Sequence, residues 1–318
     1  MKSLDIVALG GNAILPAGKT GTIKEQVAIT RTAMLEIENL VAAGRHVVLT
    51  HGNGPIVGNI VMRNEAIKDD IPPMPLDVCG ADSQGGIGYM IQQTLRNVLR
   101  EKGREEEVVS VITQVLVDAA DPAFEKPVKP IGPFYTLDEA KKLADERGWE
   151  IAEDGSWGYR RVVPSPHPIE IIEIGVVRNL VRAGIIVVTV GGGGIPVVLK
   201  DGLYEGVEAV IDKDLASSLL ARRLGAERLV ILTDIDAVYK DYGKPSAKPL
   251  GKVSLDEVKM LYQAGQFPAG SMGSKIQAAI EFLDNGGGCV VITEPGDLGD
   301  AIEGRVGTTI SGRSTDGN

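Results

Sequence analysis

The sequence predicts an α/β fold in which a mostly parallel sheet lies between two layers of helices. Apolar strands and amphipathic helices alternate along the 318 residues, which is the pattern of parallel strand–helix–strand units. Apolar residues make up 43% of the chain and aromatic residues only 4%, and such an aliphatic core suits a sheet that is buried on both faces. Many of the 40 glycines cluster at strand ends, where open α/β sheets bind their ligands.

Composition and charge exclude several classes of function. The 33 basic and 43 acidic residues give a net charge of −10, so we expect no binding to nucleic acid. Cys79 and Cys289 are the only cysteines, which predicts neither a disulfide framework nor a zinc site. The chain has no apolar run of membrane-spanning length and no signal peptide before its first strand. We therefore expect a cytoplasmic protein that does not enter the membrane.

The first third of the chain repeats one unit, which is an apolar strand followed by a glycine turn and a helix. The strand that begins at Asp5 ends in a glycine turn at 10–12, and the strand at 46–50 ends in a second one at 52–54. We expect both turns to present backbone N–H groups to a ligand, although the first carries no lysine. The remaining elements predicted here are helices at 22–43, 56–67 and 78–99 and a strand at 108–115.

Residues 118–168 differ in character from the rest of the chain. This segment is rich in proline and charge, contains one predicted helix at 137–147, and ends in the run from Pro164 to Pro168. A plain loop of this length is uncommon in a compact domain, and strand–helix alternation resumes after it. We therefore predict a single domain over residues 1–318 that contains 118–168 as an inserted, protruding lobe or lid.

Strand–helix alternation after the lobe completes the predicted sheet. The predicted strands lie at 185–190, 228–233, 289–293 and 307–310. The predicted helices lie at 169–183 and 254–264, and two more open at 210–216 and 270–275.

Four glycine turns in one chain indicate an anion site. They lie at 10–11, 52–54, 191–194 and 270–273. Any one of them alone is most simply a tight turn, but four at strand ends and helix starts supply N–H donors with no side chain in the way. No G-x-G-x-x-G follows the first strand, and no G-x-x-x-x-G-K-[ST] occurs. A dinucleotide site and a Walker-type phosphate loop are therefore not expected.

Three lysines are candidates for the positive charge that the first turn lacks. Most lysines are solvated surface residues, but Lys213 and Lys275 stand at predicted helix starts, where a cation opposes the helix dipole. A bound anion at the same place would explain both. Lys129 stands between Pro127 and Pro130 in the lobe, and a stiff backbone there suits a placed charge.

Two acidic stretches have alternative interpretations. Asp212 and Asp214 flank Lys213 and either cap the helix or hold lysines in register. The turn at 234–236, which precedes Tyr239, is either plain surface or a nucleoside pocket with a carboxylate on a ribose hydroxyl and the ring against a base. The residues leave these two readings equally open.

Together these stretches resemble the carbamate kinases, a branch of the amino acid kinase family. The resemblance runs from the first strand to the last. It is carried by Ala8-Leu-Gly-Gly-Asn-Ala13, His51-Gly-Asn-Gly-Pro55, Pro75-Leu-Asp-Val-Cys79, Ser83-Gln-Gly85, Ile87-Gly-Tyr89, Lys129-Pro-Ile-Gly-Pro-Phe-Tyr135, Arg161-Val-Val-Pro-Ser-Pro166, Gly191-Gly-Gly-Gly-Ile-Pro196, the segment from Gly206 to Ala216, Leu232-Thr233, and Gly270-Ser-Met-Gly273 with Lys275.

The resemblance implies a three-layer α/β/α sandwich with an inserted protruding subdomain, assembled as a homodimer. It implies reversible phosphoryl transfer between ATP and carbamate, giving ADP and carbamoyl phosphate, with ATP synthesis in arginine catabolism as the expected direction. Mg²⁺ is expected to be held mainly by ATP oxygens and water, with no protein ligand assigned. By the same resemblance, the catalytic residues are Lys129, Lys213, Asp214 and Lys275, and the substrate-binding residues are Gly10, Gly11, Asn12, Gly52, Asn53 and Gly54. The nucleotide-binding residues are Lys213, Thr233, Asp234, Ile235, Asp236, Tyr239, Met272, Gly273 and Lys275.

Two residues depart from the family pattern, and two other functions stay open. Ser274 stands where the pattern has proline, and Asp82 puts a charge into a helix of small residues that we expect at the dimer contact. An acetylglutamate kinase is the alternative within the family, but many such relatives carry a lysine where this chain has Ala8. A non-catalytic nucleotide sensor is the other alternative, against which the three retained lysines argue.

Overall fold

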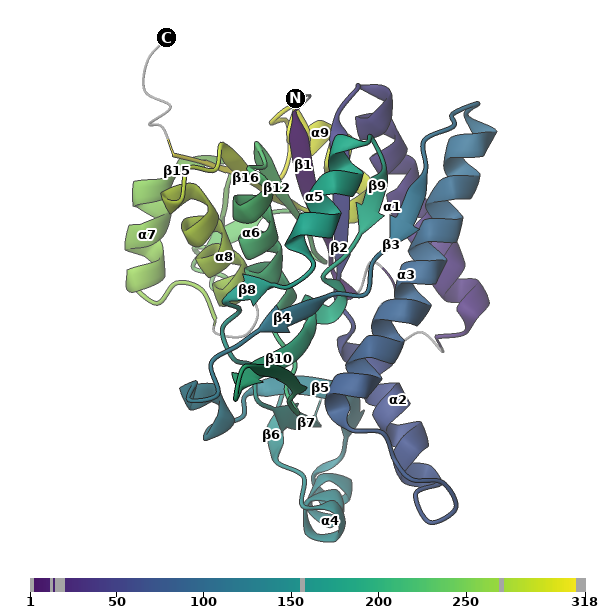
Figure 1. Cartoon of the computed structure of the whole chain (residues 1–318). Helices are drawn as coiled ribbons and strands as arrows, with labels where there is room; N and C mark the ends of the chain where they lie inside the picture. The colour runs from purple at the N-terminus through teal and green to yellow at the C-terminus, as the bar shows by residue number, and fades with distance from the viewer. Residues whose placement is uncertain (1–2, 12–13, 15–20, 155–157, 269–271, 313–318) are drawn as a thin grey trace.

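An eight-stranded sheet forms the middle layer of the computed structural model, which describes residues 3–11, 14, 21–154, 158–268 and 272–312 (Figure 1). All neighbouring strands pair in parallel except the β16–β17 pair, which is antiparallel. The predicted fold class, a mostly parallel sheet between helices, is confirmed. In spatial order the strands are β15 (Lys252–Ser254), β17 (Thr308–Ser311), β16 (Cys289–Thr293), β12 (Arg228–Leu232), β1 (Leu4–Leu9), β2 (His46–His51), β9 (Ile186–Val188) and β3 (Val108–Ser110).

Alternation along β1 divides the core into two layers, because successive side chains of a strand point to opposite faces. Val7 packs in the cluster that includes α1 (Ile23–Ala42), α3 (Leu76–Glu101) and α9 (Leu298–Ile302). Ile6 packs in the cluster on the other face. That second layer is formed by α5 (Ile174–Arg182), α6 (Lys213–Leu224), α7 (Leu255–Gln263) and α8 (Met272–Asp284).

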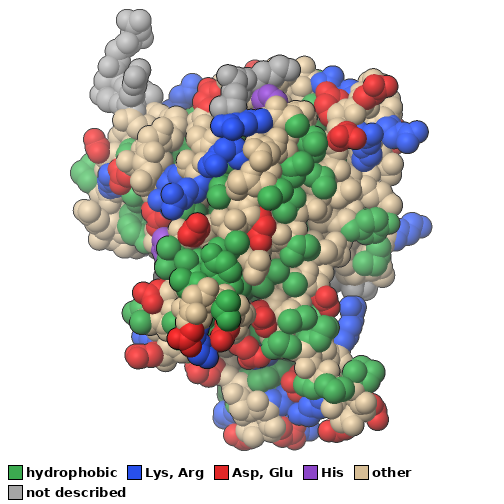
Figure 2. All heavy atoms as spheres, viewed as in Figure 1, with side chains coloured by type: hydrophobic (Ala, Val, Ile, Leu, Met, Phe, Trp, Pro, Cys, Tyr) green, Lys and Arg blue, Asp and Glu red, His purple; other side chains and the backbone are tan. Residues whose placement is uncertain are grey.

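Three smaller sheets lie outside the main one. The segment predicted as the lobe contains a three-stranded antiparallel sheet with α4, which is the lowest helix in Figure 1. Charged side chains of both signs lie among hydrophobic and uncharged ones at this lower end of the molecule (Figure 2). The limits of the lobe at 118 and 168 stay a prediction. The lobe sheet consists of β5 (Lys129–Tyr135), β7 (Tyr159–Val163) and β6 (Ile151–Glu153), beside α4 (Leu137–Arg147). A four-stranded sheet consists of β11 (Leu203–Gly206), β10 (Ile195–Lys200), β4 (Gln114–Leu116) and β8 (Glu170–Ile171), and a two-stranded sheet of β13 (Val238–Lys240) and β14 (Lys248–Leu250). A 3₁₀ turn lies at Pro122–Phe124.

Two predicted elements prove to be wrong in extent. The strand predicted at 108–115 is two strands, because Gln84 of α3 fixes the chain between them: its amide oxygen accepts from the Thr113 N–H at 2.9 Å, and its amide nitrogen donates to the Thr113 carbonyl at 3.0 Å. The helix predicted at 169–183 begins only at Ile174. The Ile172 N–H donates to the Gln114 carbonyl, so the residues before the helix extend the β4 sheet instead.

Candidate active site

A cavity, which we call the central cavity, opens where the carboxyl ends of β1, β2 and β12 meet, as is usual for ligand sites of α/β sheets. The first two glycine turns line it, and so do side chains from the starts of α6 and α8 and from the lobe. Among the residues predicted from the sequence, it is lined by Gly10, Gly11, Gly52, Asn53, Gly54, Lys129, Lys213, Thr233, Asp234 and Lys275.

Gly10 and Gly52, one in each of the first two turns, act through their lack of a side chain more than through their N–H groups. The Gly10 N–H donates to the Leu232 carbonyl at 2.9 Å, and the Gly52 N–H donates to the Leu9 carbonyl at 3.0 Å, so both donors are already used. A Cβ atom on Gly52 would lie 3.2 Å from Cδ of Lys213. The bare backbone at Gly52 therefore leaves room for the Lys213 side chain to reach the cavity.

Asp214 holds two lysines in register at the centre of the site. Its Oδ1 accepts from Nζ of Lys213 at 2.5 Å, and its Oδ2 lies 3.2 Å from Nζ of Lys275. These lysines belong to the first turns of different helices, α6 and α8. Asp214 itself is 2% exposed. One buried carboxylate thus places two ammonium groups side by side.

Burial and charge act differently on the three members of this cluster. Burial lowers the pKa of Lys213 below its ordinary value in spite of the nearby Asp214. Burial would also lower the pKa of Lys275, but the carboxylates of Asp214 and Asp212 outweigh it and raise that pKa. Burial would raise the pKa of Asp214, but the two ammonium groups outweigh it and lower that pKa. A bound anion would therefore stabilise the charge of Lys213 most of all.

Lys129 reaches the same cluster from the lobe. Its Nζ donates to Oδ2 of Asp212 at 2.6 Å, and the other carboxylate oxygen, Oδ1, accepts from the Asp214 N–H at 2.8 Å. Asp212 is thus the N-cap of α6 and at the same time the partner of the lobe lysine. The three predicted lysines converge on two neighbouring aspartates.

Residues predicted for the nucleotide line a second cavity beside Lys275. It is lined by Thr233, Asp234, Ile235, Tyr239, Met272 and Lys275, together with Tyr242, Gln266, Phe267 and Pro268. Among the described residues, neither Asp236 nor Gly273 lines it. Asp236 accepts from the Tyr239 hydroxyl at 2.9 Å, and Gly273 donates its N–H to the Pro268 carbonyl at 2.8 Å. Each of these two residues thus holds, by a hydrogen bond, a residue that lines the cavity.

Two residues that line the central cavity also take structural positions, and some predicted residues lie outside the description. Asn53 is buried, and its side-chain amide donates to Oγ of Ser83 in α3 at 2.7 Å. Gly54 is the first residue of α2 (Gly54–Ala66). Asn12 lies outside the described residues, as do two residues of the fourth glycine turn, 270 and 271.

Sequence reasoning missed two polar residues of the central cavity, Arg160 and Asp154, and treated Asp212 only as a possible cap or lysine spacer. Arg160 stands beside Arg161 in the sequence, and the alternation of side chains in β7 is the signal that separates them. The Arg161 guanidinium carbon lies 4.8 Å from the centre of the Trp149 ring, whereas Arg160 lines the cavity. The pairing of Asp212 with Lys129 has no local signal, because 83 residues separate them.

In the part of the chain that the structure describes, the site offers no clear general base and no cluster of metal ligands. His51 is 1% exposed and does not line the central cavity, and burial lowers its pKa to about 4, which makes it a weak proton acceptor. Among the described residues, no three His, Cys, Asp or Glu side chains gather as a metal site. The two carboxylates at the centre already accept from lysines, which does not suit a protein-held divalent cation.

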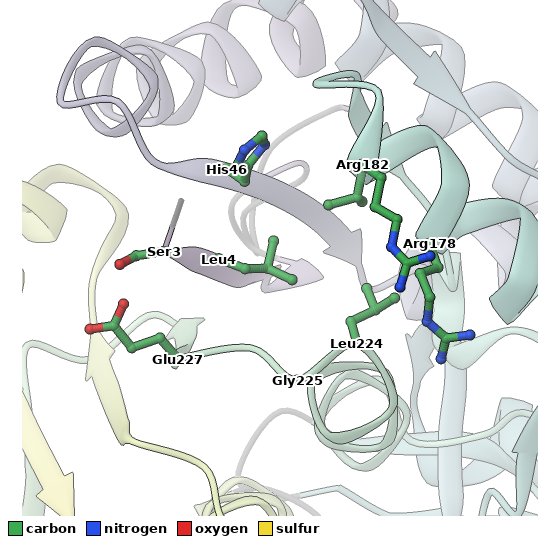
Figure 3. Close-up of a pocket in the computed structure, with 9 residues that line it drawn as sticks. Ser3, Leu4, His46, Arg178, Arg182, Leu224, Gly225 and Glu227 are labelled. Atoms are coloured by element: carbon green, nitrogen blue, oxygen red, sulfur yellow. The ribbon is translucent and has the colours of Figure 1, made fainter. Parts of the chain in front are cut away.

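Another cavity lies at the opposite edge of the main sheet, where the parallel strands begin (Figure 3). His46, Arg178, Arg182 and Glu227 surround it. Arg178 donates to the Arg223 carbonyl at 2.8 Å, and a cation is favourable at this end of α6. None of the predicted lysines lines this cavity. The carboxyl edge of the sheet therefore carries the candidate active site.

Comparison with known proteins identifies the family. The amino acid kinase family matches residues 4–294. The carbamate kinase of Pyrococcus horikoshii is 49% identical over 308 residues, which are 96% of this chain and 98% of the relative; that of Thermococcus kodakarensis is 48% identical over the same shares. A carbamate kinase from Giardia lamblia bound to AMP-PNP is 44% identical, has a TM-score of 0.89 and is covered, like this chain, over 98% of its length.

The fold and these matches define a kinase: the chain belongs to the amino acid kinase family. Its nearly full-length relatives place it among the carbamate kinases of that family. The resemblance predicted from the sequence is thereby confirmed. An N-acetylglutamate synthase from Neisseria gonorrhoeae has a TM-score of 0.59 at 16% identity, which is a likeness of fold alone.

No helix among the described residues is long and apolar enough to cross a membrane.

Proposed function

We propose that this chain transfers the γ-phosphoryl group of MgATP to carbamate, reversibly, and that it works as an ATP-forming enzyme on carbamoyl phosphate and ADP. The observation that carries the proposal is the convergence of Lys129, Lys213 and Lys275 on Asp212 and Asp214 beside two glycine turns. Phosphoryl transfer needs placed positive charge and little else from the protein.

The roles follow from position in the two cavities. Lys213 and Lys275 neutralise the transferring phosphoryl group, and Asp214 keeps the two ammonium groups together. Residues 10, 11 and 52–54 form the wall against which carbamate binds, and Lys129 closes that wall from the lobe. A carbamate oxygen attacks the γ-phosphorus as the bond to the ADP oxygen breaks. Carbamate is already an anion, so the reaction needs no general base, and the buried His51, whose pKa burial lowers to about 4, would be a weak one.

Nucleotide binding belongs to the cavity beside Lys275. An adenosine group there would contact Tyr239 and Met272, while Asp234 and Asp236 carry the nearby acidic charge. The Asp236 carboxylate holds the Tyr239 hydroxyl and so orients the ring. Mg²⁺ enters as part of the MgATP substrate, held by phosphate oxygens and water, because the central carboxylates are taken by lysines.

We also infer a homodimer in the cytoplasm, with α3 in the contact. Val78, Asp82 and Tyr89 are exposed on α3, as are the small residues 85 and 86, and small residues let a second helix approach closely. Asp82 lies within this face and departs from the family pattern. Light scattering of the purified protein tests the inference, and a monomer mass would overturn it.

An assay with carbamoyl phosphate, ADP and Mg²⁺ tests the proposed reaction. ATP formed by the purified protein, and lost when carbamoyl phosphate is omitted, is the expected result. ATP-dependent phosphorylation of N-acetylglutamate, with no reaction on carbamate, would favour the acetylglutamate kinase alternative. Nucleotide binding with no turnover of either acceptor would favour the sensor.

A further inference from the structure

We propose that Arg160 of the lobe binds the planar O–C–O group of carbamate, and that the Asp154 carboxylate holds the same guanidinium until the acceptor arrives. The proposal rests on the proposed function, because it names the side chain that recognises that acceptor. Both residues line the central cavity together with Lys129. Neither is explained by the lysine–aspartate cluster.

Backbone contacts set the position of Arg160 relative to the second glycine turn. The turn at 52–54 runs directly into α2, and a Cβ atom added to Gly58 of that helix would overlap the backbone of Gly132. The backbone of α2 at Gly58 and the backbone of β5 at Gly132 therefore meet with no side chain between them. The carbonyl oxygen of Gly132 accepts from Nε of Arg160 at 3.0 Å. The guanidinium is thus tied, through Gly132 and Gly58, to the helix that begins at the acceptor turn.

The guanidinium is also fixed in orientation and still has donors to offer. Its carbon lies 5.2 Å from the centre of the Phe134 ring, a cation–π contact that restricts its plane. Nη1 donates to Oδ2 of Asp154 at 3.0 Å. These contacts use two of the five N–H groups of an arginine. The remaining donors belong to a side chain that is only 13% exposed and lines the central cavity.

The chemistry of the acceptor distinguishes an arginine from a lysine. Carbamate presents two oxygens in one plane, and the guanidinium fork matches such a pair with two parallel hydrogen bonds. A phosphoryl group is tetrahedral and is well served by the point charges of Lys213 and Lys275. The cavity thus contains a planar donor for the planar reactant and ammonium groups for the phosphoryl group.

Asp154 behaves as a replaceable partner because it is the more exposed member of the pair. Its side chain is 36% exposed, against 13% for Arg160, so a carboxylate that leaves Arg160 moves into water at little cost. Carbamate offers the guanidinium the same kind of oxygen pair. Binding of the acceptor then exchanges one carboxylate-type partner for another, and Asp154 weakens apparent acceptor affinity by competition.

The test compares Michaelis constants for carbamate and ATP, in the direction that forms carbamoyl phosphate, in three variants of the full chain. Arg160→Lys keeps the charge but loses the fork, and we expect KM for carbamate to rise about tenfold while KM for ATP stays within twofold. Asp154→Asn removes the competing charge, and we expect the same KM to fall about two- to threefold. Arg147→Lys is the matched control, since Arg147 is in the lobe and contacts the Trp149 ring instead of lining the cavity.

The outcomes separate this proposal from the proposed function. An unchanged KM for carbamate in Arg160→Lys, beside an active wild type, would overturn the role of Arg160 alone. A higher KM for carbamate in Asp154→Asn would mean that Asp154 positions Arg160 and would overturn the competition. A wild type that transfers no phosphoryl group between ATP and carbamate would overturn the function itself. The ATP constant of each variant reports whether the nucleotide half is still folded.

Discussion

Two clusters of ion pairs, each built around a buried aspartate, lie at opposite ends of the central strands. At the amino end, the fully buried Asp5 accepts from Arg228 at 2.9 and 3.1 Å and from Arg45 at 2.6 Å, and Arg45 also contacts Glu227 at 3.1 Å. Two arginines contact two carboxylates there, of which Asp5 is fully buried and Glu227 is 55% exposed. At the carboxyl end, three lysines pair directly with two aspartates, beside a cavity that Asp234 also lines.

The difference separates a structural cluster from a binding cluster. Buried charges are tolerated when they are paired and hydrogen-bonded, and the amino-end cluster meets that requirement within the protein. The carboxyl-end lysines are paired as well, but Lys213 and Lys275 share the single carboxylate of Asp214, and burial lowers the pKa of Lys213 in spite of that partner. Two buried ammonium groups on one carboxylate support our proposal that this end binds a phosphate.

The largest effect is expected for Lys213→Ala. Removing this ammonium group from the transferring phosphoryl should lower kcat for ATP formation by about a thousandfold. Folding stability should change little, because Asp214 keeps Lys275 at 3.2 Å. Coupled ATP detection and thermal unfolding measure the two quantities. Lys259→Ala is the control, since Lys259 pairs with Asp284 on the surface; a wild-type kcat in Lys213→Ala would contradict the phosphate role.

The amino end should respond in the opposite way. Asp5→Asn leaves Arg228 and Arg45 next to each other without their shared carboxylate, and loss of one partner in a buried pair costs about 3 kcal/mol of unfolding free energy. Urea denaturation measures this loss. The kcat of the folded variant should remain near that of the wild type, because the active site lies at the other edge of the sheet. A stable Asp5→Asn with a reduced kcat would break the comparison.

Lys129→Ala tests the part of the carboxyl-end cluster that comes from the lobe. We expect kcat to fall about a hundredfold, which corresponds to slightly less than 3 kcal/mol, while KM for ADP changes little. The reason is that Lys129 contacts Asp212 at the central cavity and does not line the cavity beside Tyr239. A large loss of ADP affinity, with kcat preserved, would place Lys129 in the nucleotide half instead.

The sequence predicted the parts of the site that have local signals. Lys213 and Lys275 were identifiable because a cation at a helix start needs an explanation, and the glycine turns were identifiable from their place after apolar strands. Alternation along β7 separates Arg160 from Arg161, but the place of Arg160 in the central cavity and the second role of Asp212 depend on contacts between distant segments, which no local pattern encodes. The division of 108–115 into two strands likewise depends on Gln84, which lies 29 residues from Thr113.

The smallest expected effect is that of a substitution at His167, which belongs to a third, partly exposed cluster of charges. It tests whether burial explains the difference between the first two clusters. The Glu281 carboxylate of α8 lies 3.0 Å from Nε2 of His167, at the end of the lobe segment, and 3.4 Å from Arg222 of α6. The hydrogen bond to Glu281 raises the pKa of His167 above its ordinary value, and burial only partly opposes this. The protonated histidine therefore stabilises the fold at a pH below its unfolded pKa.

That stabilisation should be lost as the pH rises through the folded pKa of His167, which lies above 6.5. His167→Gln should accordingly reduce the unfolding free energy by less than about 1 kcal/mol at pH 6, the usual range for a partly exposed pair, and by nothing measurable at pH 9. Urea denaturation at both values measures this. The His167 side chain is 45% exposed, whereas that of Asp5 is fully buried. If His167→Gln cost as much as Asp5→Asn, burial could not be what makes the amino-end cluster structural.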